Sequence, residues 1–222
     1  MYKALAYKEW LKVRWFVLAA MGLEIIALIY IFSNLRATIE FNSAVNIWNY
    51  VVFRNLMFFE PIKYIPLFIG IIIGVAQYLP ELSEMKLKLT LHLPLKENNV
   101  FVFLNLFGTV LLFLLFLPVV FILLAGSSVV FPQEIITATI LTIIPWFLAA
   151  FVVYYFLSAI MIEPLWSRRV LILIIGFVWL FQLLMSSSYG EYKLIIRSLF
   201  ILVILFSYIN LLSGLRFKRG AK

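Results

Sequence analysis

Glu24 is the ionisable residue that lies deepest inside an apolar run of this sequence, within residues 15–32. Ala20 and Ala27 share its helical stripe, and small residues there indicate packing against another helix rather than against lipid. A carboxylate in hydrocarbon is costly, so it is by default a functional-site hypothesis: it would contact a substrate or a counter-charge, or stay protonated and hydrogen-bonded. Asn105 is a possible partner. The alternative is a structural polar clamp between helices.

The charged stretch at residues 77–100 contains the single histidine of the chain, His92. It has neither a cysteine nor an aspartate nor a second histidine beside it, so we predict no metal site. No nucleophile–base pair can be assembled around one histidine, so no catalytic residue is predicted and the chain is not expected to be an enzyme. The chain also lacks the phosphate-binding motif G-x-x-x-x-G-K-[ST] and should not hydrolyse ATP by itself.

The composition defines the class of protein that must position these residues. The 222 residues are 65% hydrophobic and only 13% charged, and the mean hydropathy is +1.11. A soluble domain of this length could not bury that much apolar surface, so the fold class is an all-α integral membrane protein. The net charge of +8 comes from basic residues at the ends of apolar runs, which indicates membrane topology and a lipid bilayer as partner rather than a nucleic acid.

Six apolar runs are long enough to cross a bilayer, which takes roughly 20 residues each. They are residues 15–32, 61–78, 100–124, 135–162, 170–185 and 194–212. Residues 1–14 predict a short amphipathic helix at the interface, with Tyr2, Ala6, Trp10 and Val13 on one stripe and the lysines turned toward lipid headgroups. The alternative is a frayed, charged N-terminus that only sets topology. Residues 33–60 read as a mostly polar loop that could contain a second interfacial helix.

The distribution of lysine and arginine predicts the orientation. Thirteen of the eighteen lie in the N-terminal segment, the 77–100 stretch, the 163–169 turn and the C-terminal tail, and five lie in the other connections. Positive charge accumulates on the cytoplasmic side, so both termini and the 77–100 loop are expected in the cytoplasm. Within that loop apolar residues alternate as in a strand and also form a helical stripe, and we favour a short amphipathic helix through about Leu91, ended by Pro94.

This layout resembles the membrane (permease) subunit of a type-2 ABC exporter, over the whole chain at the level of architecture. The matching features are the basic N-terminal helix, the six spans and a cytoplasmic loop with an acidic residue followed by a leucine-rich run that closes in Leu93-Pro94. The resemblance implies a single permease domain, 1–222, and an ATPase-coupling loop at 77–100. Its coupling residues would be Glu81, Leu82, Ser83, Glu84, Met85 and Lys86.

The same resemblance implies partners and a location. A separate ABC ATPase subunit would bind ATP and Mg²⁺, so this chain needs no cofactor of its own. The N-terminal helix would be a second contact with that ATPase, and a second permease copy or a paralogue would complete the path across the cytoplasmic (inner) membrane. Residues 186–193 are too short for the insertion that several branches have before the last span, so the 33–60 loop could replace it. The alternative function is a membrane assembly or scaffold subunit, not driven by ATP, that docks a soluble partner through the 77–100 loop.

Overall fold

The chain is helical, as its composition predicts. The computed structural model describes residues 2–54, 56–83, 97–186 and 188–219, and these contain no strand. The helices are α1 (Tyr2–Arg54), the 3-10 turn η1 (Glu60–Ile62), α2 (Ile65–Ser83), α4 (Glu97–Ser128), α5 (Gln133–Ile162), α6 (Trp166–Leu184) and α7 (Ile196–Arg219).

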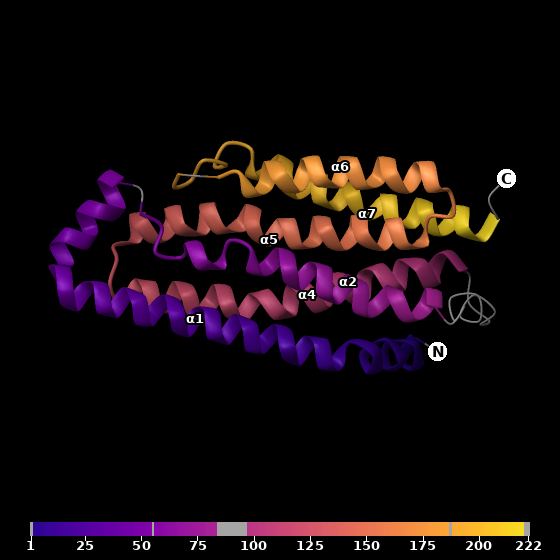
Figure 1. Cartoon of the computed structure of the whole chain (residues 1–222), viewed down its shortest axis with the longest axis horizontal. Coiled ribbons are helices and arrows are strands. Elements are labelled where there is room, and N and C mark those ends of the chain that lie inside the picture. Colours follow the sequence, from indigo (N-terminus) through magenta and orange to yellow (C-terminus); the bar gives the residue numbers. More distant parts are fainter. Residues whose placement is uncertain (1, 55, 84–96, 187, 220–222) are drawn as a thin grey trace.

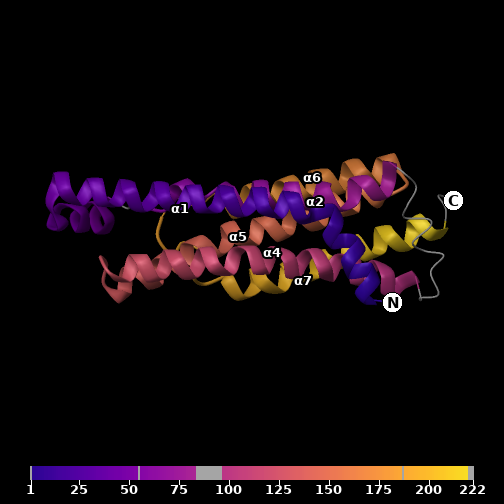
Figure 2. The same cartoon turned by 90° about the horizontal axis from the view of Figure 1, so that it is seen from below.

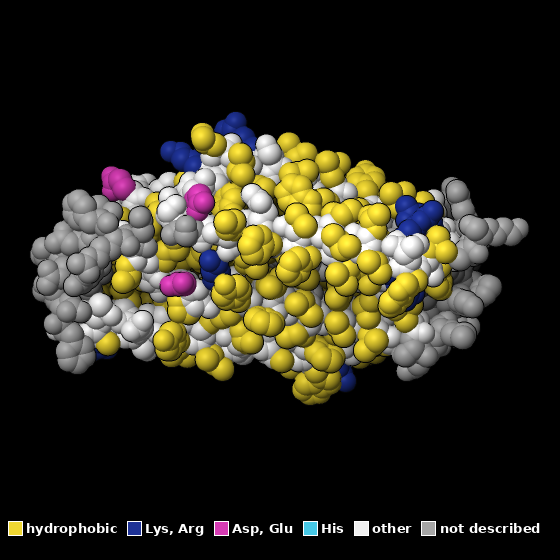
Figure 3. Space-filling model, turned by 45° about the horizontal axis from the view of Figure 1, so that its top comes forward, with side chains coloured by type: hydrophobic (Ala, Val, Ile, Leu, Met, Phe, Trp, Pro, Cys, Tyr) yellow, Lys and Arg dark blue, Asp and Glu magenta, His cyan; other side chains and the backbone are white. Residues whose placement is uncertain are grey.

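Within the described ranges, six helices are long and apolar enough to cross a membrane, and the spanning stretch of α6 is the shortest, with 19 residues. At a rise of about 1.5 Å per residue it spans roughly 28 Å, close to the thickness of the hydrocarbon core. The chain is therefore a multi-pass membrane protein with the predicted number of spans. Figure 3 shows apolar side chains over most of the visible middle of the molecule, with charged side chains mostly toward its two ends.

The helices form one elongated bundle around α5, which packs against α2, α4, α6 and α7, while α1 packs against α2 and α4. Figures 1 and 2 show that α1 begins and α7 finishes at the same end of the bundle, which we call the termini end. The end of α2 and the start of α4 lie at the same end. The residues of α5 are mostly buried from Thr142 to its end, which agrees with its central position. In α6 only three residues are buried.

The helix α1 corrects two expectations. The predicted break after residue 14 does not exist, and residues 33–54 of the expected 33–60 loop continue the same 53-residue helix. The physical reason is the absence of breakers: α1 contains no proline, and Gly22 is its only glycine. Polar residues alone do not end a helix. Figure 2 shows the N-terminal part of α1 at an angle to the rest, and Figure 1 shows its last part turning across the other end of the bundle.

The limits of the 77–100 loop also change. Residues 77–83 belong to α2, which contains Pro80, and α4 already begins at Glu97. Proline is tolerated in a membrane helix where neighbouring groups compensate for the missing hydrogen bond. Glu84, Met85, Lys86 and His92 lie outside the described residues, as does the helix expected through Leu91.

Two glycines of α2 bring that helix close to α5, as the spacing Gly70-x-x-x-Gly74 indicates. A Cβ atom at Gly70 would lie 2.7 Å from Val153 Cγ1, and one at Gly74 would lie 2.9 Å from Leu157 Cδ2. Both distances are shorter than van der Waals contact. At Gly70 a Cβ atom would also meet the backbone carbonyl oxygen of Ala150, whereas at Gly74 the flexible end of Leu157 would have to shift, so the close approach depends most on Gly70.

Candidate functional site

A buried ion cluster joins α1 to the last turn of α2 at the termini end. The carboxylate of Glu81 is 1% exposed, and its Oε1 lies 2.7 Å from Lys8 Nζ and 2.8 Å from Lys12 Nζ. Lys12 Nζ is also 2.6 Å from Oε1 of Glu9, which is fully buried. Two ammonium groups thus neutralise two carboxylates that would be costly to bury alone.

The inward face of the N-terminal part of α1 is formed by Leu5, Glu9 and Val13, which are all buried and spaced four residues apart. This corrects the expected orientation of the two lysines, which face α2 rather than lipid headgroups. Tyr2 and Trp10 are exposed, as the apolar stripe of an interfacial helix would be. A buried carboxylate on a facing helix attracts the lysines, and a helical pattern in one segment cannot reveal it. Whether this part of α1 lies at the membrane interface stays a prediction.

Gln77 continues the cluster into the centre of the bundle. Its backbone carbonyl accepts from Lys12 Nζ (3.3 Å), and its side-chain Nε2 donates to the carbonyl of Leu104 in α4 (2.9 Å). The hydroxyl of Tyr154 in α5 donates to Gln77 Oε1 (2.8 Å). Gly108 leaves the space for this bond, since a Cβ there would lie 2.7 Å from Gln77 Oε1.

A second set of bonds adds α7 to the same level. Asn210 Nδ2 donates to the hydroxyl of Tyr78 (3.2 Å) and to Oδ1 of Asn105 (3.3 Å). Asn105 Nδ2 in turn donates to the carbonyl of Ser207 (3.3 Å). The expectation that Asn105 would face Glu24 is therefore wrong, because Asn105 bonds to α7. We call the connected residues the polar layer: Lys8, Glu9, Lys12, Gln77, Tyr78, Glu81, Asn105, Tyr154 and Asn210.

Glu163, just after α5, forms a separate buried cluster at the same end. Its Oε2 accepts from Ser213 Oγ (2.7 Å) and from Arg216 Nη1 (3.0 Å), both in α7. Its backbone carbonyl accepts from Arg169 Nε (2.6 Å) in the first turn of α6. These bonds hold the α5–α6 turn against α7 with the charge of the buried carboxylate compensated.

Away from the termini end, aromatic side chains hold η1, α5 and the α6–α7 turn together. We call Phe58, Phe59, Phe131, Trp146 and Tyr189 the aromatic cluster. The ring centroids of Phe59 and Trp146 are 5.5 Å apart, and Trp146 Nε1 donates to Ser186 Oγ (2.8 Å). Lys63 Nζ lies 5.9 Å from the Trp146 ring and donates to the Ser186 carbonyl (3.1 Å). Burial raises the pKa of the Tyr189 phenol, which stays a neutral donor to the Leu56 carbonyl (3.0 Å).

The described part of the predicted coupling segment, residues 81–83, belongs to the last turn of α2. Glu81 faces α1 and is buried rather than presented to a soluble partner, and Leu82 is half-buried. Ser83 is the last residue of α2. Glu9 is not among the predicted site residues, although its spacing of three residues from Lys12 is a usable signal for an ion pair. Nothing in a single apolar run could have paired Gln77 with Tyr154.

Glu24 is buried in α1 as predicted, together with Ala20 and Ala27. Its carboxyl lies by Ile65 and Pro66 at the start of α2, away from the polar layer, and its Oε1 has no hydrogen-bond partner.

The polar layer is suited to holding helices in register rather than to bond chemistry. Its carboxylates are paired with lysines, and among the residues described here no three His, Cys, Asp or Glu side chains meet to bind a metal. What it provides is one hydrogen-bonded connection through α1, α2, α4, α5 and α7 at a single level of the bundle.

No protein-family model, no curated protein and no solved structure matches this chain.

Proposed function

We propose that this chain is the permease subunit of an ATP-driven transporter of the type-2 ABC class, an exporter in the cytoplasmic membrane with both termini in the cytoplasm. A separate ABC ATPase would bind ATP and Mg²⁺, and a second permease copy or a paralogue would form the other half of the path. The ATPase would contact the termini end through residues 84–96 and the N-terminal part of α1.

The observation that carries this proposal is the ion cluster of Glu81 with Lys8 and Lys12. It ties the N-terminal part of α1 to the residue that lies three positions before the 84–96 segment. A soluble partner that pushes on that segment would therefore move α1 and α2 together.

The polar layer extends that movement to the other helices. Gln77 bonds to α4 and α5, and Asn210 connects α2 and α4 to α7. Hydrogen bonds are directional, so shifting α2 along its axis requires these bonds to move with it or to exchange partners. A push at the termini end would thus become a rearrangement of the whole bundle, as a permease driven by an ATPase requires.

The test is a gentle purification of the tagged full-length chain from its native host, with co-purifying proteins identified by mass spectrometry. The same purification is repeated with Glu84→Lys. The matched control is Glu134→Lys, which makes the same charge change on an exposed residue in the first turn of α5, away from the termini end.

A stoichiometric P-loop ATPase that co-purifies with the wild type and with Glu134→Lys, and is lost with Glu84→Lys, is the expected result. A wild-type preparation without such an ATPase, under conditions that preserve known complexes, would overturn the permease proposal. A stoichiometric soluble protein without a P-loop would then favour the scaffold function instead.

A further inference from the structure

Glu24 lies in a small enclosed chamber inside the membrane-spanning part of the bundle. Its side chain is 5% exposed, and the chamber is otherwise lined by apolar residues: Ile62, Ile65, Pro66, Val119 and Phe147. The chamber volume of about 10 Å³ is no more than one water molecule needs. Its Oε1 has no hydrogen-bond partner. The carboxylates of the polar layer each have a lysine within ion-pair distance, whereas no described cation lies beside Glu24. A buried carboxyl oxygen without a partner in this chamber is therefore a feature that packing does not explain.

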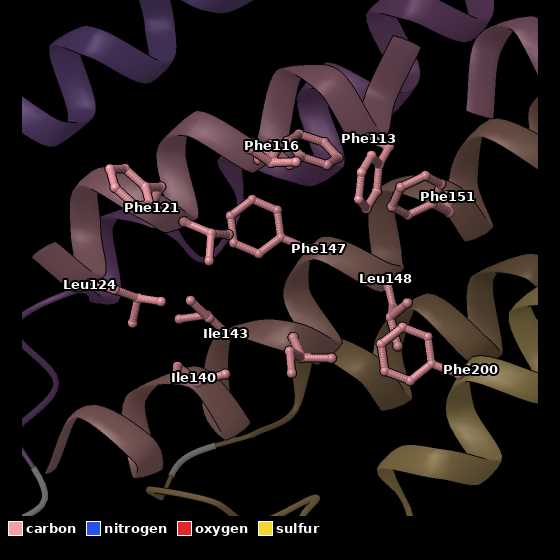
Figure 4. Close-up of a pocket in the computed structure, with 13 residues that line it drawn as sticks. Phe113, Phe116, Phe121, Leu124, Ile140, Ile143, Phe147, Leu148, Phe151 and Phe200 are labelled. Atoms are coloured by element: carbon pink, nitrogen blue, oxygen red, sulfur yellow. The ribbon is translucent and has the colours of Figure 1, made fainter. Parts of the chain in front are cut away.

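A much larger apolar groove opens between α4 and α5, next to this chamber. Its volume is about 420 Å³, and six of its 13 lining residues are phenylalanines from α4, α5 and α7 (Figure 4). They include Phe113, Phe116, Phe121, Phe147, Phe151 and Phe200. Phe113 and Phe121 are 59% and 70% exposed, so the groove is open on the lipid-facing side of the bundle. A cavity of this size and chemistry fits an alkyl chain.

The two cavities share one wall residue, Phe147. Its ring stacks edge-on against Phe116, with centroids 4.9 Å apart, and it lines both the groove and the chamber. The two cavities also adjoin along α4, where Val119 lines the chamber and the next residue, Val120, lines the groove. A rotation of the single ring of Phe147 would therefore join the apolar groove to the carboxyl of Glu24.

We propose that Glu24 and the α4–α5 groove form one binding site for an amphipathic cation, a molecule with an alkyl chain and a primary amine. The chain occupies the groove, and the ammonium group reaches the Glu24 carboxylate once the Phe147 ring turns aside. The pairing follows from charge complementarity, because an ammonium gives a carboxylate in hydrocarbon the counter-charge that none of the described residues supplies. That this ligand is the transported substance rests on the permease proposal, whereas its binding does not.

The experiment uses the full-length protein in phosphatidylcholine vesicles, dodecylamine as the probe and dicyclohexylcarbodiimide as the reagent. Bound dodecylammonium transfers a proton to the Glu24 carboxylate, and the acid adds to the carbodiimide. The free amine then attacks the activated carbonyl and forms an amide, while the carbodiimide leaves as the urea that has taken up the water. Without a bound amine the activated acid rearranges to an N-acylurea. Mass spectrometry of the peptide that contains Glu24 distinguishes the two products.

We expect the dodecyl amide at Glu24 with dodecylamine, and only the N-acylurea with dodecanol, which has the same chain without the charge. Glu9 and Glu163, which are buried but paired with cations, should stay unmodified and serve as internal controls. Glu24→Gln should lose both products. Phe147→Ala should speed the modification severalfold, whereas Phe177→Ala, on the exposed face of α6 and outside both cavities, should leave its rate unchanged.

Two results would overturn the proposal. An N-acylurea without any amide at saturating dodecylamine would mean that Glu24 is reached but binds no amine. An unmodified Glu24 would mean that the groove does not lead to it. Both decisions rest on the wild-type protein, so a variant that fails to fold does not affect them. The outcome is independent of ATPase co-purification, so either proposal can fail while the other stands.

Discussion

The polar layer and the aromatic cluster both join several helices, but they do so with different chemistry. The polar layer uses two buried carboxylates, two lysines and a chain of amide and hydroxyl bonds. The aromatic cluster uses stacked rings, with a few hydrogen bonds from Lys63 and Trp146 to Ser186.

The difference shows where this bundle can rearrange. Ring stacking fills space and is lost when the rings separate, so the aromatic cluster favours one packed arrangement. Lysine and glutamate side chains are long and can exchange partners as helices shift. On the permease proposal, the termini end would take up the push of the ATPase, and the aromatic cluster would hold the other end of the helices together.

The largest expected effect is at the termini end, with Glu81→Ala. Removal of this carboxylate takes away the buried counter-charge that Lys8 and Lys12 share and leaves Glu9 as the remaining partner of Lys12 in the cluster. Loss of one partner of a buried ion pair costs about 3–5 kcal/mol. We expect that loss in the free energy of unfolding, measured by titrating sodium dodecyl sulphate into mixed micelles. The matched control is Glu40→Ala, which breaks the exposed Arg36–Glu40 pair and should cost about 0.3–0.5 kcal/mol. Equal losses in the two variants would contradict the buried cluster.

An intermediate effect is expected in the aromatic cluster, with Ser186→Ala. The Trp146 indole is fully buried, and its N–H would lose its acceptor, which costs about 1–3 kcal/mol. The same titration measures it, and a red shift of tryptophan emission would show water reaching the ring. Ser198→Ala, on an exposed face of α7, is the control and should stay within about 0.5 kcal/mol of the wild type. If Ser186→Ala lowered the free energy of unfolding as much as Glu81→Ala does, the expected difference between the two regions would be absent.

The smallest effect is expected for Tyr154→Phe in the polar layer. The change removes only the hydroxyl that donates to Gln77 Oε1, and it leaves a carbonyl oxygen short of one donor, which costs about 1 kcal/mol. Tyr208→Phe, on the exposed face of α7, should change the free energy of unfolding by less than about 0.5 kcal/mol. If Tyr154→Phe has no more effect than Tyr208→Phe, Gln77 does not depend on α5 for its position.

Several features could be predicted from the sequence because they depend on local pattern alone. The long apolar runs require helices in lipid, since every backbone group must be bonded within its own segment. The Gly70–Gly74 spacing indicated a close helix–helix approach, and Glu24 could be recognised as buried because Ala20 and Ala27 share its stripe. The prediction of a loop at residues 33–60 is wrong for residues 33–54, which are helical. Polar residues do not end a helix by themselves, and this segment contains no helix breaker up to Arg54.

The sequence by itself determined the membrane class, the number of spans and the one carboxylate held deep among them, because hydrophobicity and helical period are properties of consecutive residues. Only the tertiary structure decided which polar groups meet. Glu81 pairs with lysines about 70 positions earlier, Asn105 bonds to Asn210 rather than to Glu24, and Phe147 separates two cavities. Such pairings depend on which helices are neighbours and how they are rotated, and no periodicity within one helix contains that information.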